Sequence, residues 1–302
     1  MSAQAPAPGA PRALVIGDVM IDTIVRPEGA IVIGSDRRAS IVTRPGGSAA
    51  NQAVWLAHFG VQVDFVGRVG AADLDRESER FRKAKVEPTL AADPRHETGR
   101  LIALVDPSGE RSFLTDRGAN EALAPADIPP ALIERADVVH LSGYSFVSAS
   151  PRAAAIRAIA RAAGRPIGVD PASAEFLREI GPANFLAWTR GATMLFPNSE
   201  EAAVLAETDD PDAQAARLAA HYPLVVIKRG VHGAEAIAGE RRWRAAAPLV
   251  KAIDSTGAGD AFVAAFLAGK MRGAPIEACL EDACAAGAAA TEFVGARPDS
   301  RN

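Results

Sequence analysis

The chain of 302 residues has few of the residues that mark several common protein classes. Its two cysteines, Cys279 and Cys284, cannot build a disulfide framework and form no CxxC pair, so we expect both to be small buried residues. The five histidines are scattered without metal-ligand spacing. Aromatic residues make up only 5% of the chain, which favours helices packed on small side chains.

An excess of charge of one sign is also lacking. Lys and Arg number 33 against 37 Asp and Glu, a net charge of −4, which leaves no electrostatic footprint for nucleic acid or an anionic membrane. No apolar run approaches the roughly 18–20 uncharged residues of a membrane span. Residues 1–12 lack the apolar core of a secretory signal and are expected to be a disordered tail. We therefore expect a cytoplasmic, globular protein with no nucleic-acid or membrane partner.

Several catalytic signatures are absent as well. There is no G-x-x-x-x-G-K-[ST] loop, which excludes a P-loop ATPase, and Gly17 after the first apolar run is not part of a G-x-G-x-x-G dinucleotide fingerprint. Neither G-x-S-x-G nor H-E-x-x-H occurs, which removes the usual hydrolase classes.

The order of the apolar runs along the chain indicates the class of fold. Short runs typical of buried strands alternate with segments of helical periodicity, which indicates a mostly parallel sheet covered on both faces. The predicted strands are 13–16, 63–66, 138–141, 166–170, 193–197 and 224–228. The predicted helices are 48–59, 151–163, 174–180, 200–206, 211–221, 259–270 and 275–293. We expect one three-layer α/β domain over 13–302, with ligands bound beyond the carboxyl ends of its strands.

Two hairpin-like segments fall outside this alternation. Residues 31–43 alternate and turn through 34–36, and 101–105 and 112–115 flank a turn at 106–109. They predict a small β-sheet lid formed by about 31–45 and 99–115. Because open sheet edges invite pairing, two lids would cover each other, and we expect a homodimer through the lid.

The sharpest motif is DSTGAGD at 254–260, followed by an apolar helix. Small residues at 257–259 let backbone N–H groups converge at a helix start, where they form an anion nest. Asp260 could simply favour the helix start. A carboxylate inside an anion site makes better sense as a base that takes a proton from a hydroxyl attacking phosphate.

A second motif, RPGGSAANQA at 44–53, places a Gly-Gly turn before a helix. Ser48 fits an N-cap, and Asn51 lies in the first turn with its amide directed toward the glycines. Glycine backbone plus an amide suits a hydroxyl-rich ligand, although a plain glycine turn explains the same residues.

These two motifs, in this order and about 200 residues apart, resemble the ribokinase-like (PfkB) family of carbohydrate kinases. The first corresponds to the family's G-G-x-x-x-N signature, and the second to its D-T-x-G-A-G-D signature with Ser255 as a variant. The resemblance implies a three-layer αβα ribokinase-like fold with a β lid. It also implies transfer of the γ-phosphoryl group of ATP to a hydroxyl, most simply a primary CH₂OH, with Mg²⁺ required and K⁺ a further candidate cofactor.

The resemblance also assigns roles to single residues. It implies that Asp260 is the catalytic base and that Gly257, Ala258 and Gly259 form the anion hole. The implied substrate contacts are Asp18, Asp22, Gly46, Gly47 and Asn51. The implied nucleotide contacts are Asn198, Lys228, Gly230, Gly233 and Thr256. Glu201, in an N-x-x-E element, would act on Mg²⁺ through water, although it also fits an ordinary carboxylate of a first helical turn.

Three readings of the function remain open at this point. The acceptor is a sugar or sugar-like molecule, with ribose, fructose and 2-keto-3-deoxygluconate among the candidates, or it is a nucleoside. The aromatic candidates for stacking on a base are Phe113, Tyr144 and Phe146. Candidate cations for an acidic or phosphorylated sugar are Arg38, Arg44, Arg111 and Arg117, which fit solvated lid charges equally well. The third possibility is a sugar or nucleotide sensor that has the fold without turnover.

Overall fold

The computed structural model describes residues 9–106 and 111–298, and the side chain of Arg111 is not described. Residues 1–8 of the predicted tail and most of the predicted turn at 106–109 lie outside these ranges. So does Asp299, which is near the potassium site that the resemblance suggests. The end of the predicted tail is structured, because Arg12 already begins the first strand.

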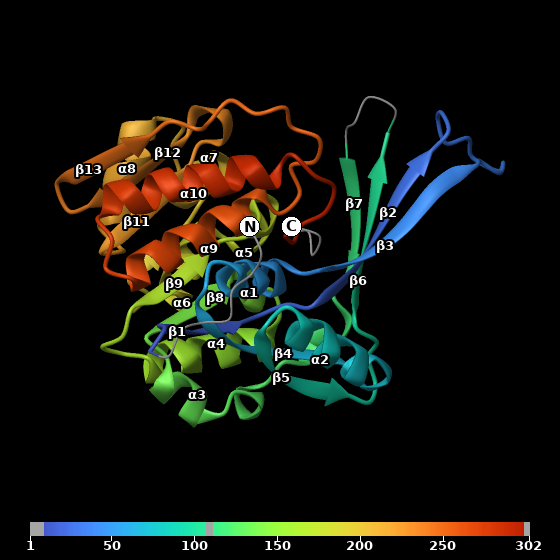
Figure 1. Cartoon of the computed structure of the whole chain (residues 1–302), viewed down its shortest axis with the longest axis horizontal. Coiled ribbons are helices and arrows are strands. Elements are labelled where there is room, and N and C mark those ends of the chain that lie inside the picture. Colours follow the sequence, from blue (N-terminus) through green and yellow to red (C-terminus); the bar gives the residue numbers. More distant parts are fainter. Residues whose placement is uncertain (1–8, 107–110, 299–302) are drawn as a thin grey trace.

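Nine strands of the described chain form one twisted sheet that runs through the main body (Figure 1). All neighbouring pairs are parallel except the two that involve β12. In spatial order the strands are β13 (Arg241–Ala245), β12 (Ala234–Ala238), β11 (Leu224–Lys228), β10 (Met194–Leu195), β9 (Ile167–Asp170), β8 (Val138–Ser142), β1 (Arg12–Ile16), β4 (Gln62–Gly70) and β5 (Val86–Asp93).

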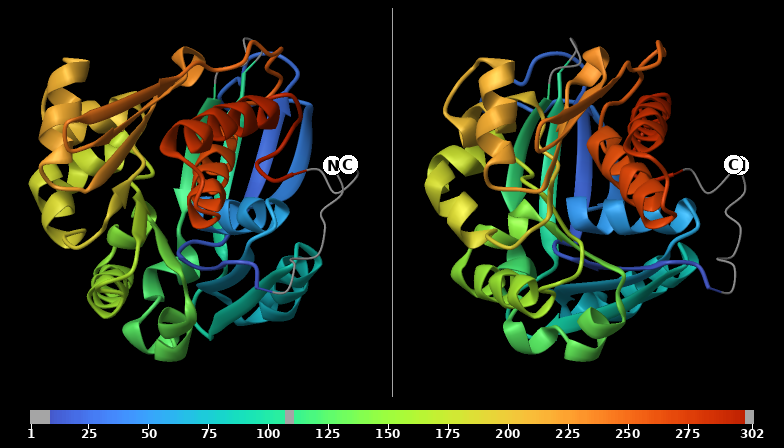
Figure 2. Two further views of the ribbon diagram at one scale, coloured as in Figure 1. Left: turned by 60° about the vertical axis from the view of Figure 1, so that its left-hand side comes forward. Right: turned by 90° about the vertical axis from the view of Figure 1, so that its left-hand side faces the viewer.

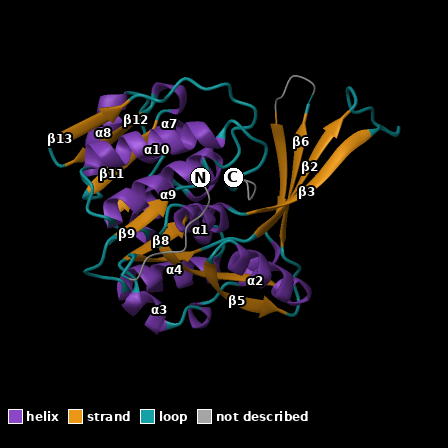
Figure 3. Cartoon of the chain, viewed as in Figure 1, coloured by secondary structure: helices purple, strands orange, loops and turns teal. Residues whose placement is uncertain are grey.

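Helices cover both faces of this sheet, as Figure 3 shows. One face packs against α1 (Ser48–His58), α2 (Leu74–Lys83), α9 (Ala258–Met271) and α10 (Ile276–Ala290). The other packs against α3 (Pro130–Arg135), α4 (Ala149–Arg161), α5 (Ala174–Ile180), α6 (Pro182–Trp188), α7 (Ser199–Ala206) and α8 (Pro211–Ala219). Short 3₁₀ turns are η1 (Ala71–Asp73), η2 (Gly118–Ala122), η3 (Pro125–Asp127), η4 (Gly143–Phe146) and η5 (Gly230–His232). The expected three-layer αβα fold is confirmed.

Strand β1 shows why the sheet is buried on both sides. Ala13 and Val15 belong to the core on one face, and Leu14 and Ile16 to the core on the other. Because side chains alternate across a strand, an unbroken apolar run is what two covered faces require.

A second sheet of four strands stands beside the main body as the lid (Figures 1 and 2). Its order is β3 (Ala39–Gly46), β2 (Met20–Pro27), β6 (Gly99–Val105) and β7 (Arg111–Asp116). The predicted segment 99–115 contains β6 and most of β7, and 31–45 contains most of β3, but β2 was not predicted. Residues 20–27 form β2, one of the two inner strands, and 31–38 lie in the connection that follows it. Ile31–Ile33 has strand-like residues, yet its side chains are exposed, because strand formation depends on a pairing partner as well as on residue type.

Other elements also escaped prediction from the sequence. Helix α2 is so rich in charge that its apolar face is reduced to little more than Phe81, and β13, with the sequence RRWRA, lacks an apolar run. Both lie near edges, where tertiary contacts rather than periodicity hold them. Among the described residues, none of the helices is both long and apolar enough to span a bilayer.

The topology reverses at β1, which pairs with β4 on one side and β8 on the other. Ligands of open α/β sheets bind at such a reversal, beyond the carboxyl ends of the strands. Polar residues lie at these ends, since Asp18 follows β1, Asp170 ends β9 and Lys228 ends β11, and the lid stands over the same end of the sheet (Figure 2).

Candidate active site

The turn before α9 is held in a shape that only glycine allows. Gly257 has φ +78°, and a Cβ on it would lie 2.5 Å from the carbonyl oxygen of Ala296. Asp254 fixes the turn by accepting hydrogen bonds from the N–H groups of Thr256 (2.9 Å) and Gly295 (3.2 Å). The turn therefore presents the start of a 14-residue helix, whose first N–H groups have no acceptor within the helix. Of the predicted anion-hole groups, the Ala258 N–H also meets the Ser255 carbonyl at 3.3 Å.

Asp260, in the first turn of α9, faces the start of α1. Its Oδ1 accepts hydrogen bonds from Ser48 Oγ (2.9 Å) and Gln52 Nε2 (3.1 Å), and its Oδ2 accepts one from Asn51 Nδ2 (3.0 Å). A carboxylate offers about four acceptor positions, two on each oxygen. Three are occupied by one turn of α1, and the remaining one is on Oδ2.

The environment of Asp260 tunes its proton affinity. Burial raises the pKa of this carboxyl from 3.8 to about 7, and the negative charge of Asp170 adds to the effect. The hydrogen bonds from Asn51 and Ser48 and the charge of Lys228 act in the opposite direction. A carboxyl group with a pKa near neutrality is suited to take and release a proton at physiological pH.

Lys228 ends β11 and supplies the positive charge of the site. Its Nζ donates to Asp170 Oδ2 at 2.8 Å, and it lies 3.7 Å from the position that a Cβ on Gly259 would occupy. Burial alone would lower the pKa of Lys228, but the carboxylates of Asp170 and Glu201 outweigh it and raise the pKa. A permanent cation thus faces the first turn of α9.

The predicted N-x-x-E element opens α7 as a capping box. Asn198 Oδ1 accepts from the Glu201 N–H (2.8 Å), and Glu201 accepts from both the N–H and the Nδ2 of Asn198, each at 2.8 Å. Burial raises the pKa of Glu201 to about 7, with Lys228 opposing the shift. This geometry is consistent with both interpretations of Glu201, as a carboxylate of a first helical turn and as a group that acts on Mg²⁺ through water. Each of its oxygens accepts one hydrogen bond from Asn198 and keeps a further acceptor position.

A largely apolar cavity of about 350 Å³ lies beside Lys228 and the turn of residues 229–233. Gly230 and Gly233 shape this turn, in which the Arg229 N–H donates to the Gly233 carbonyl at 2.8 Å. The other walls are formed chiefly by the loop before α9, by α9 itself and by α10: Pro248, Leu249, Val250, Ala258, Phe262, Gly287 and Thr291. The volume falls in the range of small-ligand pockets, and its polar end is the end nearest the anion turn.

Asp22 lies on β2 of the lid, directly beside Gly46. Gly46 lies so close that a Cβ on it would overlap the Asp22 carboxyl, and Asp22 Oδ1 is buried without a hydrogen-bond partner among the described residues. Burial raises its pKa to about 6, although Arg297 opposes the shift. A buried acceptor without a donor is where a ligand hydroxyl would be expected to bind.

Asp18 and Gly47 lie under this end of the lid. Asp18 accepts from the N–H groups of Ser48 (3.1 Å) and Ala49 (3.2 Å), so both of its oxygens cap α1. Gly47 packs directly on the Asp18 backbone. Both residues, predicted as substrate contacts, thus lie where they position the start of α1.

Three residues of the site were not singled out from the sequence. Gln52 links Asp260 to Asp170, His140 contacts Gln52, and Arg297 donates to Asn51 Oδ1 at 2.9 Å and to the Gly46 carbonyl at 3.0 Å. Arg297 thus joins the last described residues of the chain to the turn that begins α1. Gln52 follows Ser48 by one helical turn, which is a signal that the sequence did contain.

The aromatic candidates divide clearly. Phe146 is fully buried against Phe185. The guanidinium carbon of Arg117 lies 3.8 Å from the centroid of the Tyr144 ring, in a cation–π contact. Phe113 is half exposed, and the strand register puts it on the lid face that carries Asp22. Arg44, directly opposite Asp22 in the register, shares this face, and Arg38 lies in the exposed connection before β3.

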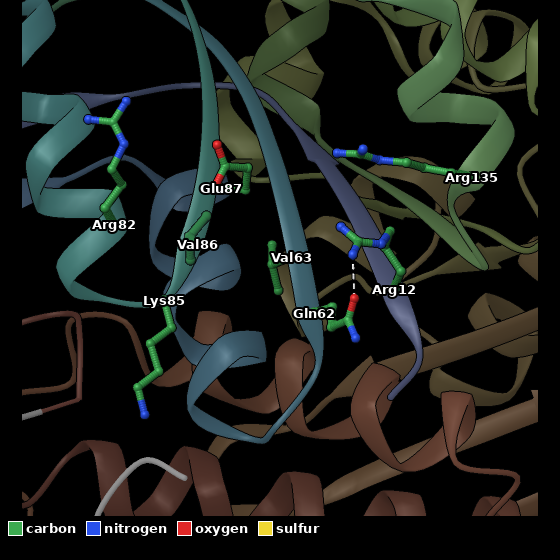
Figure 4. Close-up of a pocket in the computed structure, with 8 residues that line it drawn as sticks. All are labelled: Arg12, Gln62, Val63, Arg82, Lys85, Val86, Glu87 and Arg135. Carbon is green, nitrogen blue, oxygen red and sulfur yellow. Dashed lines mark hydrogen bonds between the residues drawn. The ribbon is translucent and has the colours of Figure 1, made fainter. Parts of the chain in front are cut away.

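A second hollow, at the opposite end of the sheet, is rich in basic residues but does not assemble a site. Figure 4 shows Arg82 and Lys85 pointing away from Arg12 and Arg135. The last two both pair with the buried Asp64, whose single carboxylate offsets part of their charge.

Comparisons with known proteins agree with this architecture. The model of the family described as pfkB family carbohydrate kinase matches residues 10–302. An ATP-dependent ribose-1-phosphate kinase of Halopiger xanaduensis is 32% identical, with 92% of this chain and 88% of that protein covered. A probable sugar kinase from Rhizobium etli has a TM-score of 0.87 at 25% identity, covering 99% and 96% of the two chains. An adenosine kinase from Sinorhizobium meliloti has a TM-score of 0.85 at 26% identity, covering 95% of each chain.

Proposed function

The chain belongs to the pfkB family of carbohydrate kinases, and from this premise we propose that it transfers the γ-phosphoryl group of ATP to a hydroxyl of a sugar or sugar-like acceptor at Asp260. The observation that carries the proposal is the Asp260 carboxylate, held by three donors with a pKa near 7 at the start of a helix that faces Lys228.

In the proposed reaction the acceptor hydroxyl lies at the free position of Asp260 Oδ2. Asp260 takes the hydroxyl proton as the oxygen attacks the γ-phosphorus, and the bond from that phosphorus to the bridging oxygen of ADP breaks. The N–H groups of residues 257–259 and Lys228 stabilise the charge on the transferred group. Asp22, Asn51, Gly46 and Gly47 orient the acceptor beneath the lid.

The nucleotide and its metal have fitting surroundings. The apolar cavity accepts the base, and Gly230, Gly233 and Thr256 lie along the path from it to the anion turn. Mg²⁺ keeps most of its waters and needs few protein carboxylates. Glu201 and Asn198 fit a hydrated ion, because Glu201 is a buried carboxylate whose neighbouring cation, Lys228, is already paired with Asp170. When bound, Mg²⁺ neutralises phosphate charge.

Two features bear on the class of acceptor. Arg44 beside Asp22 suits a sugar that carries phosphate or carboxylate, and the similar protein of Halopiger xanaduensis is a ribose-1-phosphate kinase. Phe113 on the same lid face suits a nucleoside, in line with the Sinorhizobium structure. We favour the sugar, because Phe113 is the one aromatic ring on the described part of this lid face.

A panel assay tests the proposal. Purified protein with Mg-ATP is offered sugars, sugar acids, sugar phosphates including ribose 1-phosphate, and nucleosides, while ADP and the phosphorylated product are both measured. Product from a sugar supports the proposal. Product from nucleosides alone favours the nucleoside kinase, and binding without product favours the sensor.

Replacing Glu201 by Gln is expected to raise the Mg²⁺ concentration needed for half-maximal rate by about tenfold, because the carboxylate charge that attracts the hydrated ion is lost. One capping hydrogen bond is also lost, so the free energy of unfolding falls by about 1 kcal/mol. Glu200→Gln is the matched control, since Glu200 is exposed and pairs with Arg178. An unchanged Mg²⁺ requirement in Glu201→Gln would contradict the assignment.

We also propose that the lid forms a homodimer. The register puts Ile41, Ile102 and Leu114 on the lid face opposite Asp22, where all three are exposed. Sedimentation is expected to show a dimer at micromolar concentration, and Ile41→Asp with Leu114→Asp is expected to give a monomer. Ile33→Asp, on the exposed connection before β3, is the control and keeps the dimer. A wild-type protein that sediments only as a monomer would rule the dimer out.

A further inference from the structure

A buried polar chain runs behind the proposed base. Gln52 Nε2 lies within hydrogen-bond distance of Asp260 Oδ1 (3.1 Å), Asp170 Oδ2 (3.2 Å) and Ser48 Oγ (3.3 Å). Gln52 Oε1 lies 2.7 Å from Nε2 of His140 on β8. The side chains of Gln52 and His140 are completely buried, so neither can touch substrate and neither can exchange its partners for water.

The orientation of the Gln52 amide has a direct effect on both carboxylates. In the orientation of the structure, its NH₂ group donates to Asp260 and Asp170. If the amide turned by 180°, its carbonyl oxygen would stand against two carboxylates and would repel their negative charge. The two carboxylates therefore favour the orientation of the structure, and a donor to the Gln52 oxygen on the other side of the amide reinforces it.

His140 can supply this donor because the two nitrogens of its ring have different surroundings. Nε2 lies 2.7 Å from the Gln52 oxygen, whereas Nδ1 is buried and has no partner with hydrogen-bond geometry among the described residues, although the backbone of Gly168 lies close enough to raise the pKa of the ring. A buried orphaned N–H is rarer and less favourable than an acceptor left unpaired. The proton is therefore best placed on Nε2, where it donates to Gln52.

We propose that His140 is a positioning residue, which as the neutral Nε2–H tautomer holds the Gln52 amide with its NH₂ group directed at Asp260 and Asp170. The inference rests on the proposed role of Asp260 as the base. Burial keeps the ring neutral by lowering its pKa to about 4. Lys228 also lowers the pKa, whereas Asp170 and the backbone of Gly168 raise it.

Two further details suit this role. A Cβ on Gly168 of β9 would lie 2.7 Å from His140 Nδ1, so the ring occupies space that only glycine leaves open. Phe196 packs edge-on against the ring at 6.1 Å between centroids. The ring is thus fixed in place by its packing, and the tautomer is the variable that sets the Gln52 amide.

The first test is spectroscopic and needs no turnover. Long-range ¹H–¹⁵N spectra of the protein with labelled histidine are expected to show His140 as the Nε2–H tautomer, unprotonated from pH 8 down to about 5. An Nδ1–H tautomer, or a ring that titrates near its ordinary value of 6.5, would overturn the proposal. This measurement decides the inference even if the panel assay finds no kinase activity.

The second test follows the rate against pH. His140→Leu removes the donor and leaves the Gln52 oxygen buried without a partner, so the amide is held less firmly and Asp260 loses part of its stabilisation as a carboxylate. The groups that surround Asp260 are otherwise unchanged, namely Ser48, Asn51, Asp170 and Lys228. The acidic limb of kcat is expected to move up by about one pH unit, with little change in KM. His140→Gln, whose amide nitrogen can replace Nε2, is expected to restore the limb.

Two controls separate positioning from packing. Val139→Ala alters the same strand on its other face and is expected to lower Tm without moving the limb. Gln52→Met alone and the double variant with His140→Leu are expected to have the same profile, because His140 acts through Gln52. The proposal would be overturned if the effects of the two substitutions on kcat multiplied in the double variant. It would also be overturned if the pH profile of His140→Leu equalled that of Val139→Ala.

Discussion

Replacing Asp260 by Asn is expected to lower kcat by about 10²–10⁴-fold, the contribution of a positioned general base. The Asn side chain has the size of Asp but cannot accept the proton of the acceptor hydroxyl. The KM values for ATP and acceptor should change little, and removing a negative charge from an anion site should tighten ATP binding slightly. Initial rates of product formation with the best acceptor from the panel give the measurement.

The pH dependence supplies an internal control for this variant. Because the active form of the base is the carboxylate and its pKa is about 7, the wild-type kcat/KM is expected to rise with pH and to level off above about 7. In Asp260→Asn this rise of kcat/KM with pH should disappear, leaving a low rate that does not follow the titration of residue 260. A folded variant that keeps near-normal turnover, or keeps this rise, would refute the catalytic role.

Stability must be measured beside the rate. In Asp260→Asn the new NH₂ group meets Asn51 Nδ2, and Asn51 cannot turn freely because its Oδ1 accepts from Arg297. We expect a cost of about 1–2 kcal/mol in the free energy of unfolding. If Asp260 were only a helix-start carboxylate, the variant would show this loss of stability and retain its specific activity, so the two effects are separable.

Replacing Lys228 by Met is expected to give the second large effect, on turnover and stability together. The variant removes the cation that faces the anion turn, so kcat should fall by about 10²–10³-fold, as for loss of one donor to a developing negative charge. It also leaves Asp170 buried without its ion-pair partner, which costs about 3–5 kcal/mol of folding free energy. ATP turnover and denaturant unfolding measure the two effects.

A compensating variant distinguishes the two roles of Lys228. Asp170→Asn in the Lys228→Met background removes both buried charges, so most of the lost stability is expected to return while turnover stays low. Asp170→Asn alone reports how much turnover depends on Asp170. If the double variant regained turnover together with stability, Lys228 would be structural only, and its assignment to the transferred phosphate would fail.

The parts of the site that were predictable from sequence share a local cause. The turn at 254–260 and the glycines at 46–47 precede helices within a few residues, and such backbone shapes depend on residues that are adjacent in the chain. The three layers of the fold were predictable for the same reason, because the alternation of strands and helices is also a local pattern. Small and polar residues at strand ends were sufficient to predict that the candidate site residues lie together at one edge of the sheet.

The residues that sequence analysis missed depend on distant pairing. His140 lies in an apolar strand and looks like a core residue until Gln52, 88 positions earlier, is placed against it. Strand β2 carries apolar residues and Asp22 but became recognisable as a strand only with both neighbours in place. Periodicity cannot report such contacts, because each partner alone is consistent with an ordinary position in a core or a turn.

The contacts of Arg297 have a consequence for how the protein is made. Its guanidinium holds Asn51 and the Gly46 carbonyl, across 246 and 251 positions of sequence. Because the ribosome releases the amino-terminal part of a chain first, the early motif emerges long before the arginine that orients its asparagine. A growing or prematurely terminated chain lacking Arg297 therefore lacks both of these contacts, and the side chain of Asn51 is not held in the orientation of the finished protein.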